Sequence, residues 1–274
     1  MIYDCFVFFN ELDLLEIRLS MLNSVVDRFV IVEGDRDFSG NPKPLYFQEN
    51  KSRFQSYLPK VEHIIATDFP KFNWRKLRPT RNWDRERYQR NFLAKGFSKA
   101  TGEDWIIISD VDEIPHPEKI KGATQKPGIY CFYQELYYYY LNLLVTEFPE
   151  PNPHYGDYMP WHGSVMFQLK NLKKNPETMR TLRSSKSIVP VNEGGWHFSF
   201  LGGSDAILKK MKAYSHTEYI KEEMLNVEWI EQKVRSGEDV FGRQFKFKKV
   251  GIERLPEWIH KNAHRYPNFF LKDS

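Results

Sequence analysis

The sequence predicts a single α/β domain over residues 1–274, with a mostly parallel central sheet flanked by helices. Three observations lead to this prediction. Apolar runs of strand length alternate with helical patterns through the first 127 residues. Several of these runs stop at polar or acidic residues, where parallel sheets bind their ligands. The chain has 274 residues and is 41% hydrophobic, which is enough for one sizeable core.

The first predicted element is a buried strand at residues 3–9, which form an apolar run. Residues 10–11 then open a helical pattern. We expect Glu16 and Arg18 to lie off the apolar face of this helix. That face consists of Leu15, Leu19, Leu22 and Val26.

The next elements continue the alternation. Short strands are predicted at residues 29–32 and 61–66, and residues 34–44 read as a loop because they are rich in Gly, Pro, Asp and Asn. Residues 83–97 fit one helix. Residues 105–109 form a strongly apolar strand that leads directly into an acidic segment.

The pattern is less regular in the second half of the chain. Residues 128–136 and 164–169 look like strands, with a loop rich in Pro and aromatic residues at 149–162. Helices are predicted at residues 209–221 and 226–236. The remaining tail carries basic and aromatic residues without a clear period. No repeat or flexible linker divides the chain.

Composition excludes several classes of protein. The net charge is only +4, from 40 basic and 36 acidic residues, whereas a dedicated nucleic-acid binder has a strong basic excess. The two cysteines, Cys5 and Cys131, lie in apolar runs and are expected to be buried thiols. No run reaches the ~18 apolar residues of a membrane span. We expect a cytoplasmic location, with contact at the inner membrane face left open.

The acidic segment at residues 109–115 is the sharpest local feature. Asp110 and Asp112 follow the apolar strand, and Glu113 adds a third acid. In an extended or turning segment, residues i and i+2 can point the same way. Two carboxylates can then face one hard cation such as Mn²⁺ or Mg²⁺, which leaves positions open for phosphate oxygens. The pair Asp35 and Asp37 also follows a strand and is the weaker candidate.

Two other classes of function can use these features. A phosphohydrolase of the haloacid dehalogenase type would use Asp110 or Asp112 as a nucleophile, but such enzymes carry Thr or Val where this chain has Ile114. Their later Gly-Asp-x-x-x-Asp pattern is also missing. A non-catalytic carbohydrate-binding protein could use the aromatic residues, 16% of the chain, but would not need the Asp pair.

Several segments together resemble glycosyltransferase family 17. They occur in the family's order over most of the chain, although residues 133–186 match least well. The segments are residues 9–19, 29–33, 42–47, 85–90, 110–115 and 195–199.

The resemblance implies a GT-A-like nucleotide-sugar fold, a divalent cation, a UDP-sugar donor and inverting chemistry. We therefore expect transfer of a sugar, N-acetylglucosamine, from a UDP donor to a glycan or glycolipid acceptor. Residues 1–127 would form the nucleotide-binding half and residues 128–274 the acceptor-side half. The acceptor itself is not fixed by the resemblance.

The remaining site residues follow from position and chemistry. His197, beside two glycines, is expected to complete a metal site with Asp110 and Asp112, and His216 is its competitor. Inverting transfer needs a carboxylate base; the order of preference is Glu193 and Asp239, then Glu113 and Glu218. The residues expected to contact the nucleotide are Asn10, Glu11, Glu33, Arg87, Arg90 and Asp110.

Overall fold

A computed structural model describes residues 1–74, 76–147, 160–213 and 220–272. Within these residues, ten strands form one sheet, ordered β12-β9-β8-β10-β6-β1-β2-β3, with β11 beside β8 and β7 beside β11. The strands are β1 (Ile2–Phe8), β2 (Arg28–Gly34), β3 (Val61–Ala66), β6 (Trp105–Asp110), β7 (Glu113–Pro115), β8 (Ile129–Tyr138), β9 (Leu143–Glu147), β10 (Trp161–Gln168), β11 (Val189–Ser199) and β12 (Lys246–Lys249).

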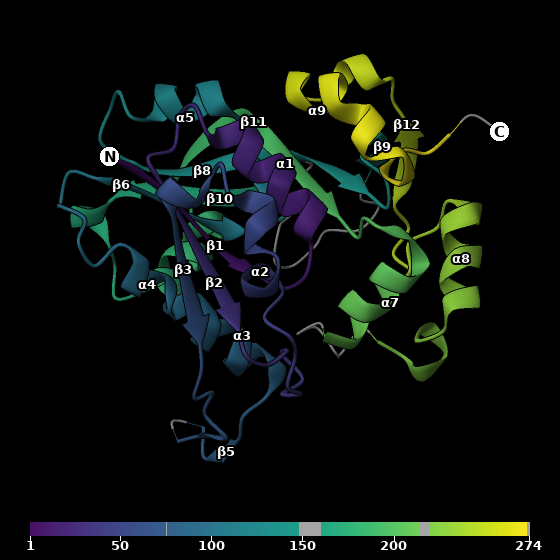
Figure 1. Cartoon of the computed structure of the whole chain (residues 1–274), viewed down its shortest axis with the longest axis horizontal. Helices are drawn as coiled ribbons and strands as arrows, with labels where there is room; N and C mark the ends of the chain where they lie inside the picture. The colour runs from purple at the N-terminus through teal and green to yellow at the C-terminus, as the bar shows by residue number, and fades with distance from the viewer. Residues whose placement is uncertain (75, 148–159, 214–219, 273–274) are drawn as a thin grey trace.

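Helices flank this sheet, and a small ribbon projects from it (Figure 1). The ribbon pairs β4 (Phe72–Asn73) with β5 (Arg78–Pro79). The helices are α1 (Leu12–Leu22), α2 (Tyr46–Glu49), α3 (Asn82–Asn91), α4 (Leu93–Gly96), α5 (Pro117–Ala123), α6 (Pro176–Thr181), α7 (Gly203–Ala213), α8 (Val227–Ser236) and α9 (Glu257–Asn262).

Most strands of the sheet run in one direction. The strands β3, β2, β1 and β6 are parallel neighbours. The strand β10 is antiparallel to both β6 and β8, so β8 again runs with β6, and β11 is parallel to β8. The predicted α/β class with a mostly parallel, helix-flanked sheet is therefore confirmed.

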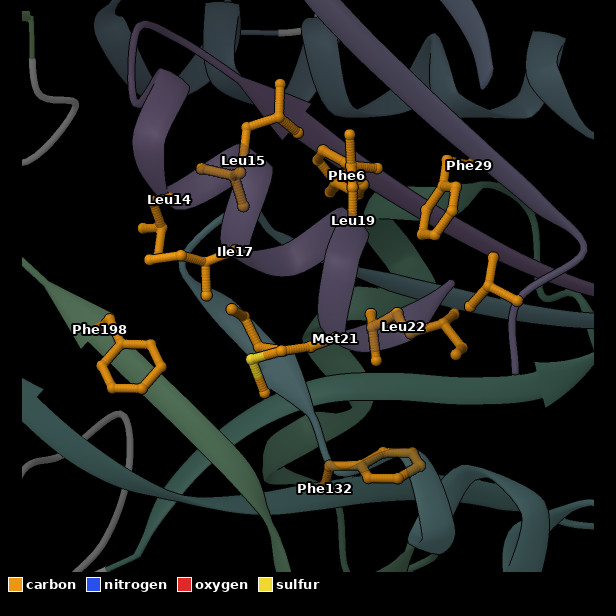
Figure 2. Close-up of a cluster of buried hydrophobic side chains, with 14 of the residues drawn as sticks. Phe6, Leu14, Leu15, Ile17, Leu19, Met21, Leu22, Phe29, Phe132 and Phe198 are labelled. Atoms are coloured by element: carbon orange, nitrogen blue, oxygen red, sulfur yellow. The ribbon is translucent and has the colours of Figure 1, made fainter. Parts of the chain in front are cut away.

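Alternation along the strands builds a core on each face of the sheet. Along β1, Phe6 and Phe8 join α1 on one face, whereas Tyr3 and Cys5 face α4 and α6 on the other. Figure 2 shows the first cluster, where side chains of α1 meet those of the strands beneath it. A third cluster lies between the far strands and the helices α7 and α8. Each core thus holds one layer of helices against the sheet.

The element boundaries correct some predictions. The helix predicted at 83–97 is two helices, α3 and α4, because residue 92 ends the first. The strand β10 begins at Trp161, inside the predicted loop 149–162, most of which lies outside the described residues. The helix predicted from residue 209 begins at Gly203, and its described part ends at Ala213. The 226–236 helix is confirmed as α8.

Two further expectations can be compared with the structure. Cys5 and Cys131 are buried free thiols, as expected. In the part of the chain that the structure describes, no helix is long and apolar enough to cross a membrane. The sheet continues across residue 127, so the division into a nucleotide half and an acceptor half stays a prediction.

Candidate functional site

The acidic turn, residues 110–113, lies at the carboxyl edge of the parallel strands. The strand β6 ends at Asp110, which is paired in register with Val7 near the end of β1. The strand β2 is in register on the other side of β1, with Phe8 opposite Glu33. The sequence therefore brings the ends of three strands together at one edge, which is where open α/β sheets bind ligands.

Arg18 of α1 fixes the backbone of the acidic turn by hydrogen bonds to its carbonyl groups. Its side chain is fully buried and makes a two-point ion pair with Asp4 of β1, at 2.6 and 2.8 Å. Its Nη1 also donates to the carbonyls of Asp110, Val111 and Glu113, at 3.0, 3.2 and 2.8 Å. We expected Arg18 off the buried face of its helix, and this was wrong, because the carbonyls of the turn replace water as its acceptors.

Asp110 is held by two arginines. Its Oδ1 accepts from Arg90 of α3 at 2.9 Å, and its Oδ2 accepts from Arg180 of α6 at 3.3 Å. Burial alone would raise the pKa of Asp110, but Arg90 and Arg180 outweigh it and hold the pKa far below its usual range. The carboxylate is therefore charged and directed toward the α3 and α6 side of the turn.

Glu113 connects the turn to the next layer of side chains. It is almost fully buried, pairs with Arg180, and accepts from the indole Nε1 of Trp161 at 2.8 Å. The ring of Trp161 in turn lies against the ring of His197, with centroids 4.4 Å apart. This engagement argues against Glu113 as a free base.

Asp112 faces a different group of side chains. Its Oδ1 lies 3.6 Å from Nε2 of His197, and its Oδ2 accepts from Lys210 of α7 at 2.8 Å. Lys210 also lies 3.4 Å from Glu11, which follows β1. Burial would raise the pKa of Asp112, but Lys210 and His197 outweigh it and keep the pKa well below its usual range. Residues 11, 112, 197 and 210 thus converge from four elements.

The donor set fits a divalent cation in part. Asp112 and His197 offer a carboxylate oxygen and an imidazole nitrogen at adjacent positions, both suited to Mn²⁺. The Nδ1 atom of His197 is buried and has no hydrogen-bond partner among the described residues. Within those residues, no three His, Cys, Asp or Glu side chains form a group that could hold a metal. The expected trio that included Asp110 is thus not assembled, because the two arginines hold Asp110 elsewhere.

Gly194 and Gly195, which precede His197 on β11, allow the backbones of neighbouring strands to approach closely. Gly195 has φ +137°, and a Cβ there would lie 2.2 Å from the carbonyl oxygen of Ile114 in β7. A Cβ on Gly194 would lie 2.8 Å from Cα of Phe132 in β8. The glycines therefore permit close approach of β11 to its two neighbouring strands.

Both predicted bases make contacts with residues other than Asp112. Glu193 has a side chain that is 88% exposed and pairs with Lys119 of α5 at 3.3 Å. Asp239 is buried and accepts from the backbone of Phe241 and from Arg243. Its oxygens thus close a local turn, so the carboxylates of both predicted bases are engaged by other groups.

The predicted nucleotide contacts divide into two groups. Glu11 belongs to the group around Asp112, and its Oε2 accepts from the backbone of Asn10 at 3.0 Å. Glu33 is fully buried and accepts from Phe47 N at 3.1 Å, with Lys43 and His63 also beside it. It therefore fixes the loop that follows β2.

The two arginines of α3 differ in their surroundings. Arg90 braces Asp110, as described above. Arg87 is half-exposed and lies 3.5 Å from Glu177, which also pairs with Arg90. His216 and Glu218 lie outside the described residues.

Sequence reasoning missed Arg180, Trp161 and Lys210. Lys210 stands three residues after Ile207 and just before Met211, both buried, so a lysine at the border of an apolar helix face was an available signal. No local pattern marks Arg180 or Trp161, since their roles depend on contacts with residues 48 to 70 positions away.

Three related proteins that share sequence similarity with this chain carry the same enzyme name. A segment of 112 residues is 34% identical to the human and rat enzymes named beta-1,4-mannosyl-glycoprotein 4-beta-N-acetylglucosaminyltransferase, and 33% identical to the mouse enzyme. This segment is 39% of this chain and only 20% of each relative.

Solved structures give weaker likenesses. HddC from Yersinia pseudotuberculosis matches with a TM-score of 0.39 and 9% identity, over 70% of this chain and 90% of that one. The inositol-1-phosphate CTP transferase from T. maritima matches with a TM-score of 0.36 and 9% identity, over 86% of this chain and 97% of that one. The family model for glycosyltransferase family 17, in contrast, matches residues 1–273, and the chain belongs to this family.

Proposed function

We propose that this protein is an inverting glycosyltransferase that moves N-acetylglucosamine from a UDP-sugar to a glycan or glycolipid acceptor, with Mn²⁺ or Mg²⁺ as cofactor. The family membership supports sugar transfer. The name of the related enzymes supports N-acetylglucosamine as the transferred sugar. The observation that carries the proposal is the Asp112–His197 pair at the carboxyl edge of the sheet.

The position of the pair fits a nucleotide-sugar site. The parallel order β3-β2-β1-β6, followed by the reversed strand β10, leaves the ends of β1 and β6 side by side. A nucleotide bound over these ends would extend its diphosphate toward the acidic turn. This arrangement supports the GT-A-like description of the fold.

Asp112 and His197 are the residues that would hold the cation. A cation there would supply Lewis-acid stabilisation of the diphosphate leaving group. The chain's own residues prepare the site: Arg18 fixes the carbonyls of the turn, and Trp161 packs against the His197 ring. Asp110 and Glu113 anchor the turn through Arg90 and Arg180.

Inversion is supported by the β linkage in the name of the related enzymes. UDP-N-acetylglucosamine carries its sugar in the α configuration, whereas the name specifies a 4-beta product. Transfer between these two configurations inverts the anomeric carbon and requires a base for the acceptor hydroxyl. Of the acids described near Asp112, Glu11 is the one that shares Lys210 with it, and we propose Glu11 as the next candidate.

The two alternative functions have less support. A phosphohydrolase would need Asp110 or Asp112 available to attack phosphorus. Arginines contact both oxygens of Asp110, and His197 and Lys210 lie beside the two oxygens of Asp112. A carbohydrate-binding protein has no use for a histidine and a lysine arranged around Asp112. Neither alternative accounts for the match to the family model over residues 1–273.

Calorimetry with UDP, with and without Mn²⁺, tests the proposal. We expect UDP to bind in the presence of Mn²⁺ and weakly or not at all after chelation. A screen of nucleotide sugars for slow donor hydrolysis would then identify the sugar. Binding of free glycans combined with no response to any nucleotide would instead favour the carbohydrate-binding alternative.

A further inference from the structure

The helix α7 is turned back over the acidic site by a tight connection. The strand β11 ends at Ser199, and Phe200, Gly202 and Gly203 follow with φ of +55°, +103° and +81°. Figure 1 shows α7 beside α8. The connection directs Lys210 of α7 to the carboxyl edge, where its ammonium lies 2.8 Å from Asp112.

The ammonium of Lys210 partly neutralises the carboxylates of Asp112 and Glu11, as a bound metal cation would. Its single charge lies against Asp112 and, at 3.4 Å, against Glu11, so it bridges carboxylates that follow β6 and β1. Its side chain is 20% exposed, which leaves the ammonium within reach of solvent and of a bound anion. A lysine stem is flexible, and the ammonium has three donors that can change partners.

Lys210 and a divalent cation would compete for Asp112. His197 lies on the Oδ1 side of this carboxylate and Lys210 on the Oδ2 side, so a cation held by Asp112 and His197 would stand close to a positive ammonium. Like charges at such separations repel by kilocalories per mole in a partly buried site. Arrival of the cation therefore favours departure of Lys210 from Asp112.

We propose that Lys210 holds the acidic site in its cation-free state and transfers to the diphosphate of the donor when cation and nucleotide bind. This inference rests on the proposed function. The anionic diphosphate suits the displaced ammonium as a partner, because a diphosphate bound over the strand ends would lie at the same edge and carries several acceptor oxygens. Lys210 would then bind substrate directly and stabilise the charge of the leaving group.

The test compares Lys210→Met with Lys212→Met, which removes the same charge from an exposed position on the same helix. Calorimetry would measure Mn²⁺ binding alone and then UDP binding in saturating Mn²⁺. For Lys210→Met we expect Mn²⁺ to bind roughly 10-fold tighter and UDP roughly 10-fold weaker, the size of one charge-assisted hydrogen bond. Lys212→Met should change neither constant.

The opposite signs distinguish this role from a structural one. If Lys210→Met weakens both ligands in step with a lower melting temperature, Lys210 is only a packing residue and the inference is wrong. Unchanged constants would also overturn it. If the wild type binds Mn²⁺ but no UDP, the proposed donor class fails, and the Mn²⁺ titration still decides whether Lys210 competes with the cation.

Discussion

Asp112 and His197 face each other across a backbone hydrogen bond between their own segments. Phe198 N donates to the carbonyl of Asp112 at 2.9 Å, and the carboxylate of Asp112 lies 3.6 Å from Nε2 of His197. The separation of these two side chains is therefore set by strand pairing, since His197 on β11 is in register with Glu113 on β7.

Asp112→Asn and His197→Ala should each remove Mn²⁺-dependent UDP binding while changing the melting temperature little. Both side chains lie outside the three apolar clusters, Asp112 in the turn between β6 and β7 and His197 within β11. Calorimetry and thermal unfolding of each variant would check this. Normal Mn²⁺ dependence combined with a large loss of stability in His197→Ala would show that this histidine is a packing residue.

Asp110→Asn should behave differently from Asp112→Asn. Asp110 shares Arg90 and Arg180 with other acids of the same charge network. Its loss should therefore destabilise the fold by roughly 1–3 kcal/mol, as expected when one member of such a network is removed. The Mn²⁺ concentration for half-saturation should change less than in Asp112→Asn. Urea unfolding and a Mn²⁺ titration measure the two effects. The reverse pattern would restore Asp110 as a metal ligand.

Glu193→Gln should keep nearly full transfer activity, since its exposed side chain pairs with Lys119 on the surface. Glu11→Gln, if Glu11 is the base, should slow transfer by ~10²–10⁴-fold with donor binding largely retained. Rates measured with saturating donor separate these variants. An inactive Glu193→Gln with normal stability would return the base to Glu193.

Asp239→Asn should reduce stability more than catalysis. Its carboxylate accepts from two backbone amides and from Arg243, and these bonds close the turn after α8. Thermal unfolding should show the loss. Transfer per folded molecule should remain within a few fold of the wild type.

Gly195→Ala should separate β11 from β7. The added methyl would lie 2.2 Å from the carbonyl oxygen of Ile114, and φ of +137° is strained for any side chain. We expect a loss of roughly 2–3 kcal/mol or more, with weaker Mn²⁺ binding as His197 is displaced. Gly122→Ala, where a Cβ would meet nothing within 4 Å, is the matched control.

The sequence was sufficient for the elements whose signals are local. The apolar runs at β1, β2 and β6 predicted three parallel strands, because a strand buried on both faces must be apolar along nearly its whole length. The acidic motif was found for the same reason: it follows directly from such a strand.

Contacts between distant segments could not be predicted. Asp110 and Asp112 are two residues apart and looked equivalent, but their partners are Arg90 and Arg180 in one case and His197 and Lys210 in the other. No periodicity encodes which helix covers which side of a turn. The different roles of Asp110 and Asp112 follow from the positions of α3, α6 and α7 around the sheet.

The acidic motif cannot form its structure independently of the rest of the chain, because its backbone depends on Arg18. A peptide that copied residues 105–115 would contain every carboxylate of the motif but not the guanidinium that binds three of its carbonyls. The shape of the turn therefore depends on α1 packed on β1, because Asp4 orients the same guanidinium. Transplanting this motif into another scaffold would therefore require the amino-terminal strand and helix as well.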